Sequence, residues 1–157
     1  MAYRSWAEPV RLLRESIGEP GTRLRAVGSA LEVPFESNRL LYSAMLEDAL
    51  SILTGNREPR PATERQLRFL SELGVESGDR ITVRVADALI KTRIALERIE
   101  ALEALRPARG DRLVRSDRDL RGRVGEIVEV TSVDRLGSVW IVGAGGYPTH
   151  PQDLRRP

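Results

Sequence analysis

The chain has no cysteine and a single histidine among its 157 residues. A disulfide framework and a thiolate metal site are therefore excluded. Aromatic residues make up only 4% of the sequence, so we expect a core of Leu, Val, Ile and Ala. No apolar run approaches the ~20 residues of a membrane span, and the N-terminus lacks an apolar signal core. We expect a soluble, cytoplasmic protein without a membrane partner.

Lysine is also nearly absent, because Lys91 is the sole lysine and every other basic residue is arginine. The net charge is only +2. The basic residues are unevenly spread, since residues 106–123 hold seven arginines against three aspartates, a local net charge of +4. Arginine carries five fixed donors that suit phosphate and carboxylate partners. This segment is therefore the first place to look for an anionic ligand.

Helical periodicity fills the first two thirds of the chain. The break at residues 54–62 has a composition that helices and central strands do not tolerate. The predicted helices are Glu8–Ile17, Thr22–Leu31, a third opened by Glu36 or Ser37 and ending at Leu53, a fourth capped by the Thr63/Gln66 capping box and stopped by Gly74, and a fifth over Val83–Leu105.

The third and fifth helices carry the clearest patterns. In the third, an apolar stripe runs from Tyr42 to Leu53, and the same periodicity turns Asp48 to solvent, together with Arg39, Ser43 and Glu47. The fifth has one stripe through Val83 and Leu105 and a second through Ala95, Ile99 and Leu102. A helix that is apolar on two sides packs between two partners. We expect it to bridge the helical region and a C-terminal sheet, or to join two subunits as a homodimer.

Alternating β-branched residues and frequent glycines mark residues 107–157 as a small, strongly bent antiparallel sheet. The predicted strands are Arg112–Arg115, Val124–Val133, Ser138–Val142 and a closing piece near Tyr147–Leu154, with Gly137 in a turn. The fold class is therefore α+β, with a helical region over 1–106 and a sheet domain over 107–157.

Three segments of this domain resemble the SH3-like small barrels that include the KOW-type modules. They are the opening Gly110–Val114, the Gly122–Ile127 segment with its Gly-x-x-Gly turn, and the closing Pro151–Leu154. The resemblance implies an SH3-like antiparallel β-barrel. KOW modules often act on RNA or on the transcription and translation machinery, whereas many other SH3-like barrels bind protein. The whole chain also resembles actinobacterial proteins. That resemblance supports the predicted architecture, but it implies no known chemistry and leaves the function open.

Several catalytic patterns are incomplete. A hydrolytic set would need His150 with a serine and Asp153, but His150 lies in a proline-rich tail. The pair Asp117 and Asp119 lies among arginines and lacks the converging oxygens of a Mg²⁺ or Ca²⁺ site. Gly143–Gly146 is followed by Tyr-Pro rather than by the Lys-Ser/Thr and helix of a phosphate-binding loop. Residues 30–34 suggest a helix-turn-helix, but the following helix turns acidic, which disfavours DNA. We expect no enzyme, metal or cofactor.

The remaining candidate is the polar surface of the sheet domain. Its arginines suit a phosphate backbone, and two aromatic rings suit unpaired bases. The candidate residues are Arg112, Arg115, Arg118, Arg121, Arg123, Trp140 and Tyr147. In the other interpretation, Trp140 packs on the long helix and the arginines pair with Asp111, Asp117, Asp119 and Glu126. The sequence therefore favours a non-enzymatic accessory protein that binds DNA or RNA, and it leaves open a protein-interaction adaptor.

Overall fold

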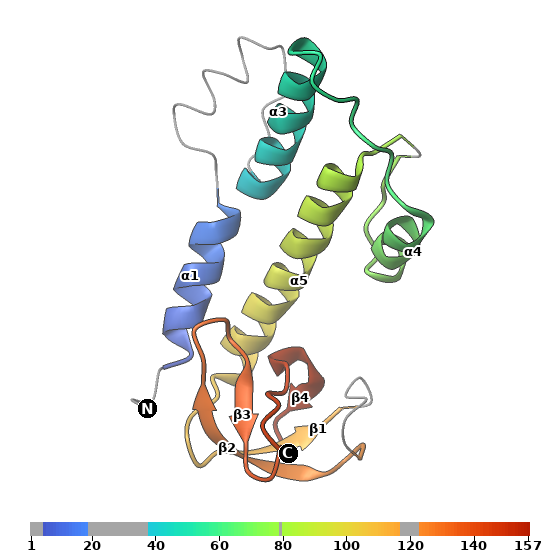
Figure 1. The fold of residues 1–157 in the computed structure, drawn as a ribbon. Coiled ribbons are helices and arrows are strands. Elements are labelled where there is room, and N and C mark those ends of the chain that lie inside the picture. Colours follow the sequence, from blue (N-terminus) through green and yellow to red (C-terminus); the bar gives the residue numbers. More distant parts are fainter. Residues whose placement is uncertain (1–4, 19–37, 79, 117–122) are drawn as a thin grey trace. The chain divides into compact units, whose positions relative to one another are not determined.

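The computed structural model describes residues 5–18, 38–78, 80–116 and 123–157 (Figure 1). The helices lie mostly in the N-terminal part and the strands in the C-terminal part, which confirms an α+β fold. The described helices are α1 (Ala7–Ile17), α3 (Arg39–Leu53), α4 (Glu64–Glu72) and α5 (Val83–Leu105). The strands are β1 (Arg112–Arg115), β2 (Ile127–Val133), β3 (Val139–Ile141) and β4 (Leu154–Arg155). The helix predicted over 22–31 lies outside the described residues.

The chain divides into two compact units. One, the helical unit, comprises Ser16–Ala95. The other, the sheet unit, comprises Met1–Glu15 together with Leu96–Pro157. The divisions fall inside α1 and α5, so the last turns of α5 group with the sheet instead of with the helices that precede them. No helix in the described ranges is both long and apolar enough to cross a bilayer.

In the helical unit, local capping sets the helix starts. The predicted capping box is confirmed, because Thr63 accepts from the Gln66 amide at 3.2 Å while Gln66 accepts from the Thr63 amide at 3.0 Å. Asn38 caps α3 by accepting from the Leu41 amide at 3.0 Å, so the cap follows the two predicted positions, Glu36 and Ser37. A side-chain acceptor at this position satisfies an amide that has no partner inside the helix.

Two predictions about the faces of α3 are wrong. Asp48, expected in solvent, is buried with 7% of its surface exposed, and Leu53, expected in the apolar stripe, is 65% exposed. Periodicity assigns faces by hydrophobicity alone, and it cannot see that Asp48 has hydrogen-bond partners from a distant segment. Leu53 is the last residue of α3, where the helix ends and the chain turns.

The sheet unit is built on an antiparallel sheet in the order β3-β2-β1-β4. Arg112 pairs with Glu129 and Leu113 with Val128, while Val130 pairs with Ile141. Inward residues alternate with outward ones, as a strand with one covered face requires. Buried side chains form an aliphatic cluster of Leu105, Leu113, Val128, Val130, Val139, Ile141 and Leu154.

The last segment of the chain hydrogen-bonds to both edges of the sheet. Thr149 and Val139 exchange two backbone hydrogen bonds of 2.8 Å, and further along Leu154 pairs with Arg115. The sheet is therefore closed by one segment that leaves β3 and reaches β1. Between these contacts lies a 3-10 helix, Pro151–Asp153, so the closing piece predicted near Tyr147–Leu154 pairs at Thr149 and Leu154 and is not extended throughout. Prolines have no amide to donate to a ladder, which keeps this stretch from running as one strand.

The prediction also begins the second strand too early. It was expected from Val124, but β2 begins at Ile127. Gly125 has a φ of 81°, in the left-handed region that glycine tolerates, and it belongs to the turn before β2. The strand therefore starts only after this turn is complete.

Candidate functional site

Two of the predicted arginines, Arg112 and Arg115, lie on opposite faces of β1. Arg112 is exposed on the outer face, while Arg115 points inward and keeps only 7% of its surface exposed. Residues three apart in a strand face opposite sides, because the side-chain period is two. The structure therefore does not bring Arg112 and Arg115 to one surface.

Arg115 forms an ion pair with Glu126 at the start of β2. The Arg115 Nε lies 3.0 Å from the Glu126 Oε2, and the two side chains are 9% and 48% exposed. The backbone holds the pair in register, since the Arg115 amide donates to the Glu126 carbonyl at 2.9 Å and the Gly125 amide to the Arg115 carbonyl at 3.0 Å. This is the pairing that the alternative interpretation of the sequence anticipated for Glu126.

The same ion pair lies in a groove of about 670 Å³ in the sheet unit. The groove brings Arg115 together with Tyr147, a residue that is 65% exposed. Its remaining walls come from the loop after β3. The lining residues are Arg115, Glu126, Gly143, Ala144, Tyr147, Pro148 and Thr149.

Glycines shape the loop that presents Tyr147. Gly143, Gly145 and Gly146 all have φ between 59° and 88°, which other residues rarely adopt. The turn is closed by a hydrogen bond of 3.1 Å from the Tyr147 amide to the Ala144 carbonyl. The run of glycines is therefore a turn that projects an aromatic ring, as the Tyr-Pro that follows it suggested.

Trp140 faces the outer side of β3, as alternation predicts, because Val139 and Ile141 are buried. The indole is half-buried, and its Nε1 lies 3.4 Å from the Asp134 carboxylate. Asp134 also accepts from the amides of Leu136 and Ser138 at 2.8 and 3.0 Å. Asp134 was missed in the sequence, although an Asp three residues before a turn glycine is a signal of such a side-chain-bonded turn.

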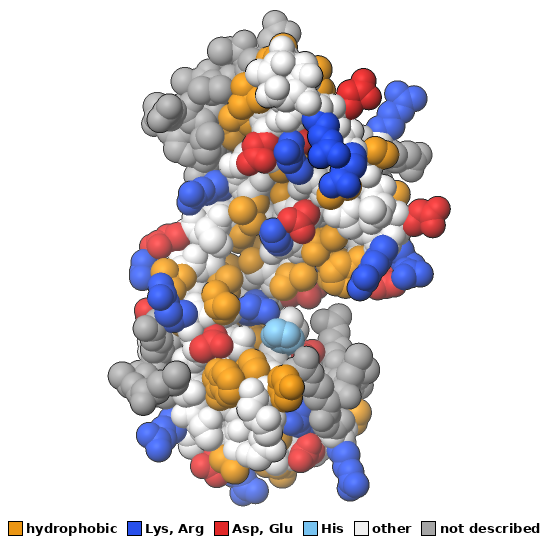
Figure 2. All heavy atoms as spheres, viewed as in Figure 1, with side chains coloured by type: hydrophobic (Ala, Val, Ile, Leu, Met, Phe, Trp, Pro, Cys, Tyr) orange, Lys and Arg blue, Asp and Glu red, His pale blue; other side chains and the backbone are white. Residues whose placement is uncertain are grey.

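Arg123 is exposed in the turn before β2, where its carbonyl accepts from the Glu126 amide at 3.0 Å. Neither Arg123 nor Arg112 has an ion-pair partner among the residues that the structure describes. Arg118 and Arg121 lie outside the described residues. Basic and acidic side chains are interspersed over the face drawn in Figure 2. A localised groove is therefore a better guide to a ligand than the overall charge.

The ring of His150 contacts a guanidinium group. Its Nδ1 lies 3.2 Å from the Nη2 of Arg98, which also donates through Nη1 to the Leu136 carbonyl at 2.9 Å. Burial lowers the pKa of Arg98, and the nearby Asp134 carboxylate acts in the opposite direction. Since arginine is always a donor, the His150 Nδ1 accepts. Within the described ranges, His, Cys, Asp and Glu do not gather in threes as a metal site would require.

Comparison with known protein families, with curated proteins and with solved structures found no match. The SH3-like likeness therefore remains a resemblance of the three short segments quoted above. The closed sheet and its groove are described from their own geometry.

Proposed function

We propose that the protein is a non-enzymatic accessory protein that binds single-stranded DNA or RNA through the groove of its sheet unit. The observation that carries this proposal is the exposed ring of Tyr147, projected by a glycine turn over a groove that also contains a guanidinium group. Aromatic rings stack on unpaired bases in single-strand-binding proteins. A cytoplasmic location, which the lack of cysteine favours, is part of the same proposal.

The arginines take different parts in this proposal. Arg115 shapes the groove through its pair with Glu126, while Arg123 supplies a cation beside the groove wall. Arg112 lies on the other face of β1, where it would contact a strand only after the strand leaves the groove. With about two phosphate contacts, log K should fall with log[salt] with a slope of about −1.4 for a single strand. The binding is therefore expected to depend more on stacking than on charge.

Fluorescence anisotropy with labelled single- and double-stranded DNA and RNA at low salt tests the proposal. We expect Tyr147→Ala to weaken single-strand binding by between about fivefold and a hundredfold, the range of one base–aromatic stack. Arg123→Ala should flatten the salt slope by about 0.7. Arg135→Ala, which removes another exposed arginine of the same unit, serves as the matched control. Absence of single-strand binding at low salt, or unchanged binding by Tyr147→Ala, contradicts the proposal.

A protein-interaction adaptor is the second candidate, and one observation favours it. Ile127 on the outer face of β2 and Val142 in the turn after β3 are 53% and 60% exposed. Exposed aliphatic side chains on a sheet face suit a protein partner better than a nucleic acid. If the adaptor function holds, Ile127→Ser should abolish partner recovery in a pull-down while Tyr147→Ala leaves it intact. Dimerisation through α5 stays a separate prediction, to be measured by light scattering.

A further inference from the structure

The helical unit contains a small polar pocket of about 110 Å³. Its walls come from the end of α3, the break at residues 57–60 and the start of α5. Ligand sites for drug-sized molecules have volumes of about 300–1,000 Å³, so this pocket suits only a single small group. Three arginines line it, Arg57, Arg60 and Arg84.

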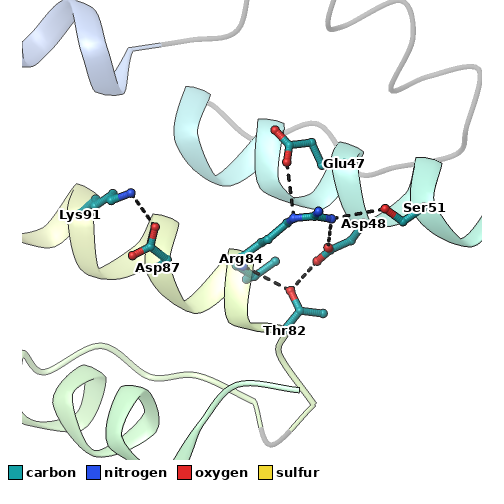
Figure 3. Close-up of polar contacts among 8 residues, drawn as sticks. Glu47, Asp48, Ser51, Thr82, Arg84, Asp87 and Lys91 are labelled. Carbon is teal, nitrogen blue, oxygen red and sulfur yellow. Dashed lines mark hydrogen bonds and ion pairs between the residues drawn. The ribbon is translucent and has the colours of Figure 1, made fainter. Parts of the chain in front are cut away.

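Asp48 fixes one of these arginines in place. Figure 3 shows Thr82 and Arg84 pointing toward Asp48 from the start of α5. The Thr82 hydroxyl donates to one carboxylate oxygen, and the Arg84 Nη1 lies 3.1 Å from the other. The Asp48 side chain is 10% exposed and that of Arg84 49%. Asp48 therefore orients the Arg84 guanidinium and offsets its charge at one edge of the pocket.

The break between α3 and α4 is tied to the start of α5 by its backbone. The Arg60 carbonyl accepts from the Val83 amide at 2.9 Å, and the Ala62 amide donates to the Ile81 carbonyl at 2.8 Å. Pro61 forms a bridge with Thr82 in this short antiparallel contact. These bonds place Arg60 beside Arg84 although the break forms neither helix nor strand.

The carboxylates near the pocket are unevenly shared among its three arginines. Its lining carries three arginines and two carboxylates, Asp48 and Glu58, while Glu47 lies outside the lining and forms a second ion pair with Arg84 at 3.5 Å. Asp48 and Glu47 both pair with Arg84, so Arg57 and Arg60 are the lining cations left for a ligand, and Glu58 is the remaining carboxylate of the lining. Arg57 and Arg60 are exposed, and neither has an ion-pair partner in the part of the chain that the structure describes.

We propose that this pocket binds a phosphate group. Guanidinium groups bind phosphate oxygens through charge-assisted hydrogen bonds, and their planar donors match phosphate geometry. The phosphate could be carried by a small metabolite or stand at the end of an oligonucleotide, and the two sources share the same chemistry. The site is independent of the groove in the sheet unit.

Titration of the full chain with inorganic phosphate, a nucleoside monophosphate and an oligonucleotide with and without a 5′-phosphate tests the site. Binding is followed by NMR shifts of the arginine side chains. We expect saturable phosphate binding with a dissociation constant of about 1 mM or tighter. Preference for the 5′-phosphorylated oligonucleotide over the monophosphate indicates a nucleic-acid end, and the reverse preference a small metabolite.

Paired variants distinguish phosphate binding at this pocket from nonspecific attraction of phosphate to positively charged side chains. Arg57→Ala combined with Arg60→Ala should weaken phosphate binding by at least about tenfold, because two charge-assisted hydrogen bonds are lost. Arg65→Ala removes an exposed arginine of α4 in the same unit and should leave binding unchanged. Glu58→Gln removes the opposing charge and should tighten binding by about two- to fivefold, an effect that a loss of folding would not produce.

The proposal is overturned if phosphate binding does not saturate below about 10 mM, or if the double variant and Arg65→Ala weaken it equally. Tyr147→Ala changes the groove of the sheet unit and not the pocket, so it should leave phosphate binding intact. Failure of the groove proposal and failure of this one are therefore distinguishable in the same set of proteins.

Discussion

The two units hold their parts of α5 with different sets of polar contacts. In the helical unit, side chains bond to side chains. Thr82 and Arg84 engage Asp48, and the Thr92 hydroxyl accepts from the Asn38 Nδ2 at 2.9 Å. Each contact needs both residue types, so a change in either removes it.

In the sheet unit, Arg14 and His150 also contact side chains of α5, but backbone carbonyls take part as well. Arg98 of α5 donates to the Leu136 carbonyl at 2.9 Å, and the Arg156 Nε donates to the carbonyl of Leu105 at 3.1 Å. The turn after β2 packs so closely on α5 that a Cβ built on Gly137 would lie 2.7 Å from Leu102 Cδ1. A substitution of Leu136 or Leu105 does not remove the acceptor, because every residue has a backbone carbonyl. The comparison predicts that the helical unit is sensitive to loss of polar side chains, and the sheet unit to added atoms.

Gly137→Ala should give the largest effect, because two costs combine. The φ of 79° disfavours any residue with a Cβ, and the new methyl group collides with Leu102. We expect a loss of about 3 kcal/mol in the free energy of unfolding, measured by urea denaturation. Gly145→Ala has the same conformational cost at a φ of 59° but nothing within 4 Å of its Cβ, and it should lose only about 1 kcal/mol. Equal losses would show that close packing on α5 contributes nothing.

Asp48→Ala should cost about 2 kcal/mol, since it removes a charged acceptor and leaves the Thr82 hydroxyl and Arg84 guanidinium without it. The control is Glu47→Ala, which removes the other carboxylate near Arg84. Glu47 is 63% exposed and 3.5 Å from Arg84, so its loss should cost less than about 0.5 kcal/mol. If the two variants lose equal stability in urea denaturation, burial of the polar contact is not what stabilises the helical unit.

Asp48 also shows where sequence reasoning reaches its limit. The periodic stripes predicted α5 over its observed range, and the capping box placed the start of α4. These features depend on residues within a few positions of one another. The burial of Asp48 depends on Thr82 and Arg84, more than thirty positions away. Local patterns cannot contain that information.

The candidate site likewise has some features that local sequence predicts and others that depend on distant residues. The alternation of β3 correctly turned Trp140 outward, because strand period is a local property. The groove that unites Arg115 with Tyr147 depends on how the closing segment returns to β1, which residues 143–149 do not encode alone. The ion pair between Arg115 and Glu126 follows from the register of β1 with β2. Seven candidate residues could be named from the sequence, but not which of them share a surface.

Asn38→Ala should cost about 1 kcal/mol, the usual value of an N-cap. Asn38 accepts from the Leu41 amide at 3.0 Å and also bonds with Thr92 of α5. Asn38→Asp retains an acceptor for both the amide and the Thr92 hydroxyl, so it should recover most of the loss in thermal unfolding. A variant with aspartate as unstable as the one with alanine would indicate that the Asn38 Nδ2 donor, and not the cap, holds this part of α5.

Trp140→Phe should have the smallest effect on stability. It replaces a half-buried indole by a smaller ring and removes the donor that lies 3.4 Å from Asp134, while Asp134 keeps the amides of Leu136 and Ser138. We expect a loss below about 0.5 kcal/mol. The same protein discriminates between two stacking surfaces, because the groove proposal assigns the base to Tyr147. Oligonucleotide affinity measured by anisotropy should therefore change less than about threefold in Trp140→Phe, and also in Trp140→Ala, far less than in Tyr147→Ala. The opposite ranking would move the binding surface from the groove to the outer face of β3.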